Sequence, residues 1–176
     1  LGAAPVVVCV SAATPVKTVQ ELIALGKSTP KGLTIASAGG FMHFVSAMFK
    51  SSAAIDATIV LYKGGAPALI DVISGQAQVA VSTLVTVGPH LRSGKVRGLA
   101  VGSARRSKVL PDLPTTAEAG LPGYEVSGWF ALVAPAGTPK EIIARLHADI
   151  TRALKQPELA QALIAAGLEP AGSATP

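Results

Sequence analysis

Two short glycine turns carry the residue types that could bind an anion. Ser37, Ala38, Gly39 and Gly40 lie between an expected strand and an expected helix, and Lys63-Gly64-Gly65 opens a further helix in the same way. Glycines at such places let backbone N–H groups approach an anion at the positive end of a helix. A carboxylate or a phosphate would suit these donors. A plain tight turn remains the alternative interpretation, because neither turn matches the Walker A or GxGxxG phosphate patterns.

Residues suited to catalysis or metal binding do not group along the chain. His43, His90 and His147 fall in three separate expected helices without HxxxH or CxxC spacing, so we expect no metal site and no cofactor. No GxSxG motif occurs, and Asp112 and Glu118 lie in a polar connector where helix capping or ion pairing is their expected role. The pattern predicts no catalytic residue and favours a binding protein over an enzyme.

The composition is that of a folded domain with a core of small and aliphatic side chains. Of the 176 residues, 49% are hydrophobic, 14% are charged and 4% are aromatic, which favours buried parallel strands and an α/β fold. The net charge of +5 comes mainly from scattered Lys and Arg, so we expect no nucleic-acid partner. Cys9, without an intrachain partner, is expected to be a buried strand residue. No apolar run approaches the roughly 20 residues of a membrane helix.

Strands and helices alternate along the first hundred residues. The pattern predicts strands at 5–10, 33–37, 57–62, 77–82 and 96–101, and helices at 18–29, 42–51, 66–74 and 85–93, the first opened by a capping box of Thr18 and Glu21. This alternation predicts parallel pairing through right-handed crossovers, which would bring both glycine turns to one sheet edge. Residues 102–124 read as an exposed connector and 129–133 as a strand. Trp129 and Phe130 are interpreted as core residues, with a place in the lining of a cleft as the alternative. Two further helices are expected at 140–154 and 158–166.

Longer segments are similar to a known family. The segments YKGGAPALIDVISGQAQVAVSTL (62–84), HLRSGKVRGLAV (90–101) and RSKVLPDLPTTAEAGLPGYEVSGWFALVAPAGTP (106–139) resemble the Bug/TctC solute-binding proteins of tripartite tricarboxylate transporters. The resemblance implies an α/β, periplasmic-binding-protein-like (type II) lobe with a parallel-rich sheet and flanking helices, plus part of a second lobe. It implies that residues 14–124 form one lobe and that 1–13 and 125–176 belong to the other. On this basis we expect an N-terminally truncated chain.

The resemblance also implies a function. Such proteins lose a signal peptide, work in the periplasm, capture a small carboxylate and deliver it to membrane permease subunits. Carried over to this sequence, the candidate ligand-binding residues are Ser37, Ala38, Gly39, Gly40, Phe41, Met42, Tyr62, Gly64, Gly65, Ser82 and Thr83. Phe41 and Met42 stand where small hydroxyl residues are common in the family, and the glycine loop is shorter than usual. Ser82 replaces a frequent acidic or amide residue, which removes a charge and should favour an anion.

The expected mechanism is reversible capture, with backbone N–H groups holding a carboxylate while the lobes hinge at residues 11–14 and 125–128. Half a cleft should bind only weakly, and its exposed apolar surface should cause homo-oligomer formation or strand exchange between copies. Two other functions stay open. An effector-binding domain of a transcriptional regulator would need a helix-turn-helix, and a nucleotide-using α/β enzyme domain would need a phosphate motif; these residues contain neither.

Overall fold

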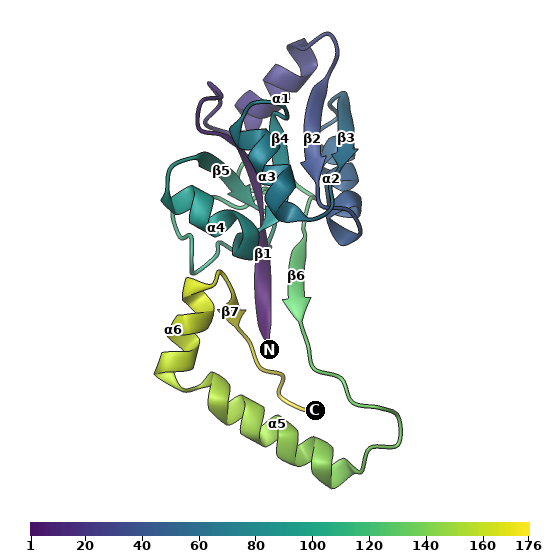
Figure 1. Cartoon of the computed structure of the whole chain (residues 1–176), viewed down its shortest axis with the longest axis vertical. Helices are drawn as coiled ribbons and strands as arrows, with labels where there is room; N and C mark the ends of the chain where they lie inside the picture. Colours follow the sequence, from purple (N-terminus) through teal and green to yellow (C-terminus); the bar gives the residue numbers. More distant parts are fainter.

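The computed structural model describes residues 1–176 and has two parts (Figure 1). We call residues 6–126 the upper part and residues 1–5 with 127–176 the lower part. The elements in chain order are β1 (Gly2–Ser11), α1 (Val19–Ser28), β2 (Leu33–Ser37), α2 (Phe41–Ser52), β3 (Ala57–Leu61), α3 (Gly65–Ile73), β4 (Val79–Thr83), α4 (Leu84–Arg92), β5 (Val96–Val101), β6 (Ser127–Phe130), α5 (Lys140–Leu154), α6 (Pro157–Ala165) and β7 (Glu169–Pro170). No helix is long and apolar enough to cross a membrane.

The sheet of the upper part is mixed, with the order β3-β2-β4-β1-β5. β2 pairs in parallel with both β3 and β4, which confirms the expected βαβ pairing there. The expectation of parallel pairing throughout is wrong for β1, which pairs antiparallel with β4 and with β5. The reason lies in the connection: β1 reaches the sheet from the lower part and not through a preceding crossover helix, so the rule for consecutive βα units does not set its direction.

β1 links the two parts because it pairs with different strands along its length. Residues 6–11 pair with β4 and β5, whereas residues 2–5 pair with β6 and β7. A hinge at residues 11–14 is therefore wrong, since these residues lie at the far end of the upper sheet; β1 changes partners between Pro5 and Val6. The division of the chain into lobes stays a proposal. Its first predicted boundary lies between residues 13 and 14, whereas residues 6–11 already pair with strands of the upper part.

Alternation along β1 sends side chains to two cores, one on each face of the sheet. Val6, Val8 and Val10 join the cluster covered by α1 and α2, and Val7 and Cys9 join the cluster covered by α3 and α4. The prediction that Cys9 is a buried strand residue is confirmed, and burial raises the pKa of its thiol to about 12. A thiol so protected from ionisation is a poor nucleophile.

Short-range hydrogen bonds stabilise the start of α1 and a turn of the connector, residues 102–124. The Glu21 N–H donates to Thr18 Oγ1 at 3.1 Å, as a capping box requires, although the Glu21 carboxylate accepts from the Lys17 N–H instead of returning to Thr18. Glu118 has the expected capping and ion-pairing role, accepting from the Thr115 N–H at 2.8 Å and from Arg106 Nε at 2.9 Å. These bonds lower the pKa of the Glu118 carboxyl, the Thr115 N–H most of all.

The lower part is open, and two sequence expectations fail there. β6 ends at Phe130 and does not continue to Val133. Trp129 and Phe130 are not core residues, with 75% and 53% of their surface exposed. The physical reason is that β6 pairs only with β1, so no further strand or helix covers these side chains. α5 and α6 form as predicted, yet neither has a buried residue.

Candidate functional site

Three helices begin where three neighbouring parallel strands end. β2, β3 and β4 lead into α2, α3 and α4, and the arrowheads of β2 and β3 point toward the lower part (Figure 1). The residues that precede these helices are Gly40, Gly64 and Thr83, and none of their side chains accepts a hydrogen bond from a backbone N–H group of its helix. The first N–H groups of a helix have no partner within the helix. This edge of the sheet therefore brings together helix N–H donors and the positive ends of three helix dipoles, although in α2 the Met42 and His43 N–H groups already bond to the Gly39 and Gly40 carbonyls.

The two glycines of these turns hold backbone conformations that other residues avoid. Gly40 has φ 53° and ψ −130°, and Gly64 has φ 112° and ψ 173°. Both lie outside the regions allowed to residues with a Cβ atom. Space is open around each position, with no heavy atom within 4 Å of a Cβ built there. Glycine is required by the backbone geometry, and a ligand could approach both turns closely.

The segment from the end of β2 to the first turn of α2 contains six of the candidate residues, 37–42, and is tied to β3. Ser37 is fully buried, and its Oγ accepts from the Gly39 N–H at 3.4 Å. The Ser37 carbonyl accepts from the Tyr62 N–H at 2.8 Å, which joins the loop to the end of β3. The Met42 N–H donates to the Gly39 carbonyl at 3.1 Å, and the Met42 side chain packs against the core. Met42 therefore closes the turn, while Gly40 and Phe41 are exposed.

Tyr62 positions the second turn. Its hydroxyl donates to Asp71 Oδ2 of α3 at 2.6 Å. The bond to the Asp71 carboxylate raises the pKa of the Tyr62 hydroxyl, with a smaller contribution from burial. The pair fastens α3 to the end of β3. Tyr62 thus supports the Gly64-Gly65 turn with a hydroxyl that is already engaged.

The end of β4 provides hydroxyl groups. Thr83 Oγ1 lies 3.1 Å from Thr86 Oγ1. Gly65 lies against Thr86, because a Cβ at Gly65 would come within 2.6 Å of the Thr86 methyl carbon, so the starts of α3 and α4 are adjacent. Ser82 is only 6% exposed, and its hydroxyl makes no hydrogen bond within the protein. By alternation it faces the same side of the sheet as Ala80, toward α3 and α4.

The candidate residues are thus gathered at one edge, and all are uncharged. Their donors are amides and hydroxyls, which suit an anion and offer neither a nucleophile paired with a base nor a metal-ligand set. No group of three or more His, Cys, Asp or Glu is placed to hold a metal ion. Sequence reasoning missed Asp71 and Thr86. The spacing of Thr83 and Thr86 at a helix start is a recognisable signal, whereas the contact of Tyr62 with Asp71 depends on how α3 packs.

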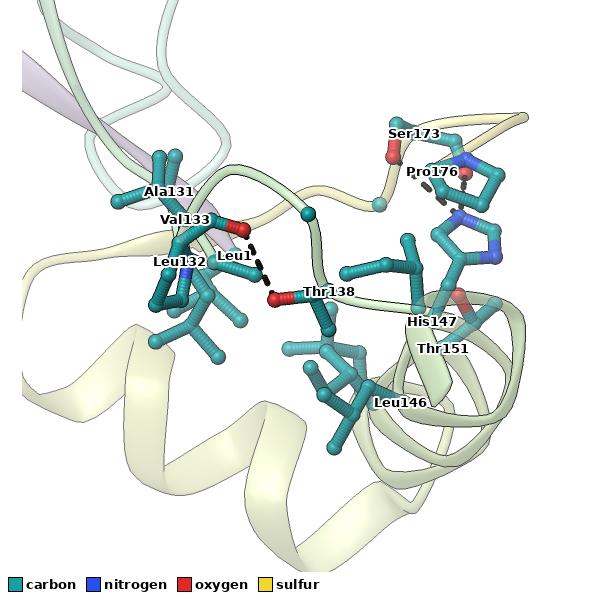
Figure 2. Close-up of a pocket in the computed structure, with 17 residues that line it drawn as sticks. Leu1, Ala131, Leu132, Val133, Thr138, Leu146, His147, Thr151, Ser173 and Pro176 are labelled. Carbon is teal, nitrogen blue, oxygen red and sulfur yellow. Dashed lines mark hydrogen bonds between the residues drawn. The ribbon is translucent and has the colours of Figure 1, made fainter. Parts of the chain in front are cut away.

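A large hollow lies elsewhere, in the lower part. It has a volume of about 600 Å³ and is enclosed by residues 131–138, α5 and the C-terminal tail (Figure 2). Its lining is mostly apolar, with Leu132, Val133 and Leu146 among the side chains that Figure 2 draws around it. His147 Nε2 lies 3.0 Å from the Ser173 carbonyl oxygen at the rim. None of the predicted ligand-binding residues contributes to this hollow.

Comparisons of the sequence with known proteins all point to the same family. The sequence profile of the tripartite tricarboxylate transporter family receptor (TctC) matches residues 1–175. BugT of Bordetella pertussis is 33% identical over 172 residues, which are 97% of this chain and 53% of that protein. A UPF0065 protein of Pseudomonas sp. strain P51 is 34% identical over 173 residues, which are 97% of this chain and 52% of that protein. The chain therefore spans about half the length of these relatives.

Solved structures of related proteins have the same fold as this chain. Rpa4515 of R. palustris, solved with adipate, superposes with a TM-score of 0.88 and 35% identity over 98% of this chain and 58% of that chain. MatC of Rhodopseudomonas palustris, solved with malate, gives a TM-score of 0.82 and 33% identity over 97% of this chain and 58% of that chain. Sequence profile, curated relatives and fold coincide over nearly all 176 residues. The chain belongs to the TctC (Bug) family of tripartite tricarboxylate transporter receptors.

Proposed function

We propose that this chain forms one side of a periplasmic solute-binding site that captures a small carboxylate for a membrane permease of the tripartite tricarboxylate type. The observation that carries the proposal is the meeting of three helix N-termini without side-chain caps at one sheet edge, among amide and hydroxyl donors of the candidate residues. Such an edge favours an anion by backbone N–H groups and helix dipoles together. Adipate and malate in two related solved proteins support a carboxylate as that anion.

Binding would proceed without chemistry on the ligand. The N–H groups at Gly40, Phe41, Gly64 and Gly65 and the hydroxyls near Thr83 would hold one carboxylate, directly or through water. The lower part approaches this edge along β1 and β6, so movement of the two parts about Pro5–Val6 and Val126–Ser127 would open or close the site. The permease and the periplasmic location are carried over from the family.

The affinity of the 176-residue chain itself should be low. The candidate residues contribute to neither hollow of the lower part, and a ligand held from one side keeps much of its water. Tight stoichiometric binding by this chain would contradict that expectation. Ligand-observed NMR, which detects weak and rapidly exchanging complexes, is the suitable measurement.

A charge placed at one helix start tests the site. Thr83→Asp keeps a good N-cap residue before α4 and adds a negative charge beside the proposed carboxylate. We expect saturation-transfer signals from a panel of carboxylates to fall at least severalfold, with unfolding stability unchanged or slightly raised. Thr18→Asp is the matched control, because it makes the same change at the N-cap of α1, which follows the opposite end of the antiparallel β1.

The same panel separates the proposal from its alternatives. Carboxylate signals that Thr83→Asp abolishes and Thr18→Asp preserves would support the proposed site. Equal loss in both variants would show that general charge, and not this site, governs binding. Signals from nucleotides with none from carboxylates would overturn the proposal in favour of a nucleotide-using domain.

A further inference from the structure

The surface around the start of α2 carries exposed apolar side chains, and no side chain caps the helix there. Phe41, the first residue of α2, is 50% exposed, and Phe44 is 61% exposed. Leu61, the last residue of β3, is also 61% exposed and pairs in register with Ser37 at the foot of the glycine loop. Large apolar side chains at this exposure have few protein contacts. Single exposed apolar side chains are normal on protein surfaces, but that does not explain three of them around the proposed ligand-binding edge.

Helix and strand geometry place these three side chains together. Residues three apart on a helix are neighbours, and helical side chains lean toward the N-terminus, so Phe44 lies over the same end of α2 as Phe41. Leu61 shares a face of β3 with Ile59, which packs against the core cluster that α2 covers. The three residues therefore border the β2–α2 loop on the α2 side of the sheet.

Ser82 supplies an independent observation at the same edge. It is more than nine-tenths buried, yet its hydroxyl has no partner, whereas the neighbouring hydroxyls of Thr83 and Thr86 face one another at 3.1 Å. Polar groups at this degree of burial are normally satisfied, by protein, water or ligand. Every fully enclosed polar side-chain atom in this protein has a partner, so the Ser82 hydroxyl must reach open space. By alternation it lies on the α3 and α4 side of the sheet, across the strand ends from Phe41, so a ligand that reaches over these ends could accept from it.

We infer that the ligand is a carboxylate with an apolar alkyl or aromatic body, and that Phe41 is a residue that determines this specificity. The inference rests on the proposed function, whose anion site it extends. The carboxylate accepts hydrogen bonds from the backbone N–H groups of the proposed anion site and from the Ser82 hydroxyl, and the apolar body of the ligand packs on Phe41 and Phe44. A ligand with hydroxyl groups along its body would lose water against Phe41 without gaining a hydrogen bond there, so it binds less well.

The experiment measures dissociation constants by NMR titration for the series acetate, butanoate and hexanoate, and for succinate against malate. Burial of methylene groups on Phe41 should strengthen binding roughly twofold to fourfold for each methylene added, and succinate should bind better than malate. In Phe41→Ser the gain along the series should largely disappear. Ile70→Ser is the matched control, because Ile70 is 61% exposed on α3 but lies away from the helix start. Leu146→Ser controls for binding in the lower hollow.

The outcomes separate the two proposals. If no carboxylate binds, the proposed function fails and the inference fails with it. If all members bind equally whatever their length, the anion site stands and the apolar specificity is wrong. If the gain with length survives in Phe41→Ser or is lost in Leu146→Ser, the apolar contact lies elsewhere and the role of Phe41 is wrong.

Discussion

Gly40 is the residue whose type is most strictly required at the candidate site. Its φ of 53° and ψ of −130° lie outside the regions that residues with a Cβ atom populate. We expect Gly40→Ala to lower the free energy of unfolding by about 1–3 kcal/mol through backbone strain alone, because no atom lies within 4 Å of the added methyl. Urea unfolding measures this. Gly172→Ala, also in open space but without a positive φ, should stay within about 0.5 kcal/mol of the parent.

An unchanged unfolding midpoint in Gly40→Ala would mean that the loop can adopt another backbone conformation. The glycine turns show what the sequence can predict at this scale. Glycine pairs between a strand and a helix mark such turns locally, so Gly40 and Gly64 were recognisable in advance. The partners of Tyr62 and Thr83 were not, since Asp71 and Thr86 reach them only once α3 and α4 have packed.

At the scale of elements, the bounds of most strands and helices follow from periodicity, whereas the direction of β1 does not. Residues 5–10 read as a buried apolar strand, and they are one. Their neighbours β4 and β5 lie some seventy or more residues further along the chain. A β-branched apolar run packs equally well in either direction between two strands. Strand direction therefore depends on the connection through the lower part, which local patterns do not report.

The contact between β7 and the connector is the main polar link from the lower part to the upper part. The Glu169 carboxylate accepts from Ser107 Oγ at 2.5 Å and from the Lys108 N–H at 2.9 Å. Close by in the chain, Gly167 packs against the first turn of α4, where a Cβ would come within 2.9 Å of the Leu84 carbonyl. The turn after α6 is therefore held against the upper part at two points.

We expect Glu169→Ala to release this link. The Lys108 amide should exchange with deuterium at least severalfold faster, because it loses its only acceptor, and the free energy of unfolding should fall by about 1–2 kcal/mol. Hydrogen exchange monitored by NMR measures the first effect. Glu158→Ala removes the same charge from the exposed start of α6 and should leave the Lys108 amide unaffected. Unchanged Lys108 exchange in Glu169→Ala would show that the Glu169 carboxylate does not protect this amide.

At the scale of the whole molecule, the upper and lower parts differ in how well they are packed. The upper part has a core on each face of its sheet. The lower part leaves large apolar side chains uncovered, including Trp129, Leu132, Val133 and Leu146, and Val133 is 93% exposed. Several large exposed apolar side chains in one part of a protein are typical of a surface that another protein surface covers. Copies of this chain in solution can supply such a surface to one another.

We therefore expect the chain to self-associate through α5 and the segment 131–138. Sedimentation velocity should show the weight-average mass rising with concentration, and Leu146→Lys should reduce that rise because it places a charge on the apolar face of α5. Ile70→Lys adds the same charge at an exposed apolar site of the upper part and should leave association intact. A monomer at every concentration would contradict self-association, and an equal effect of Ile70→Lys would show that the surface involved is not the lower one.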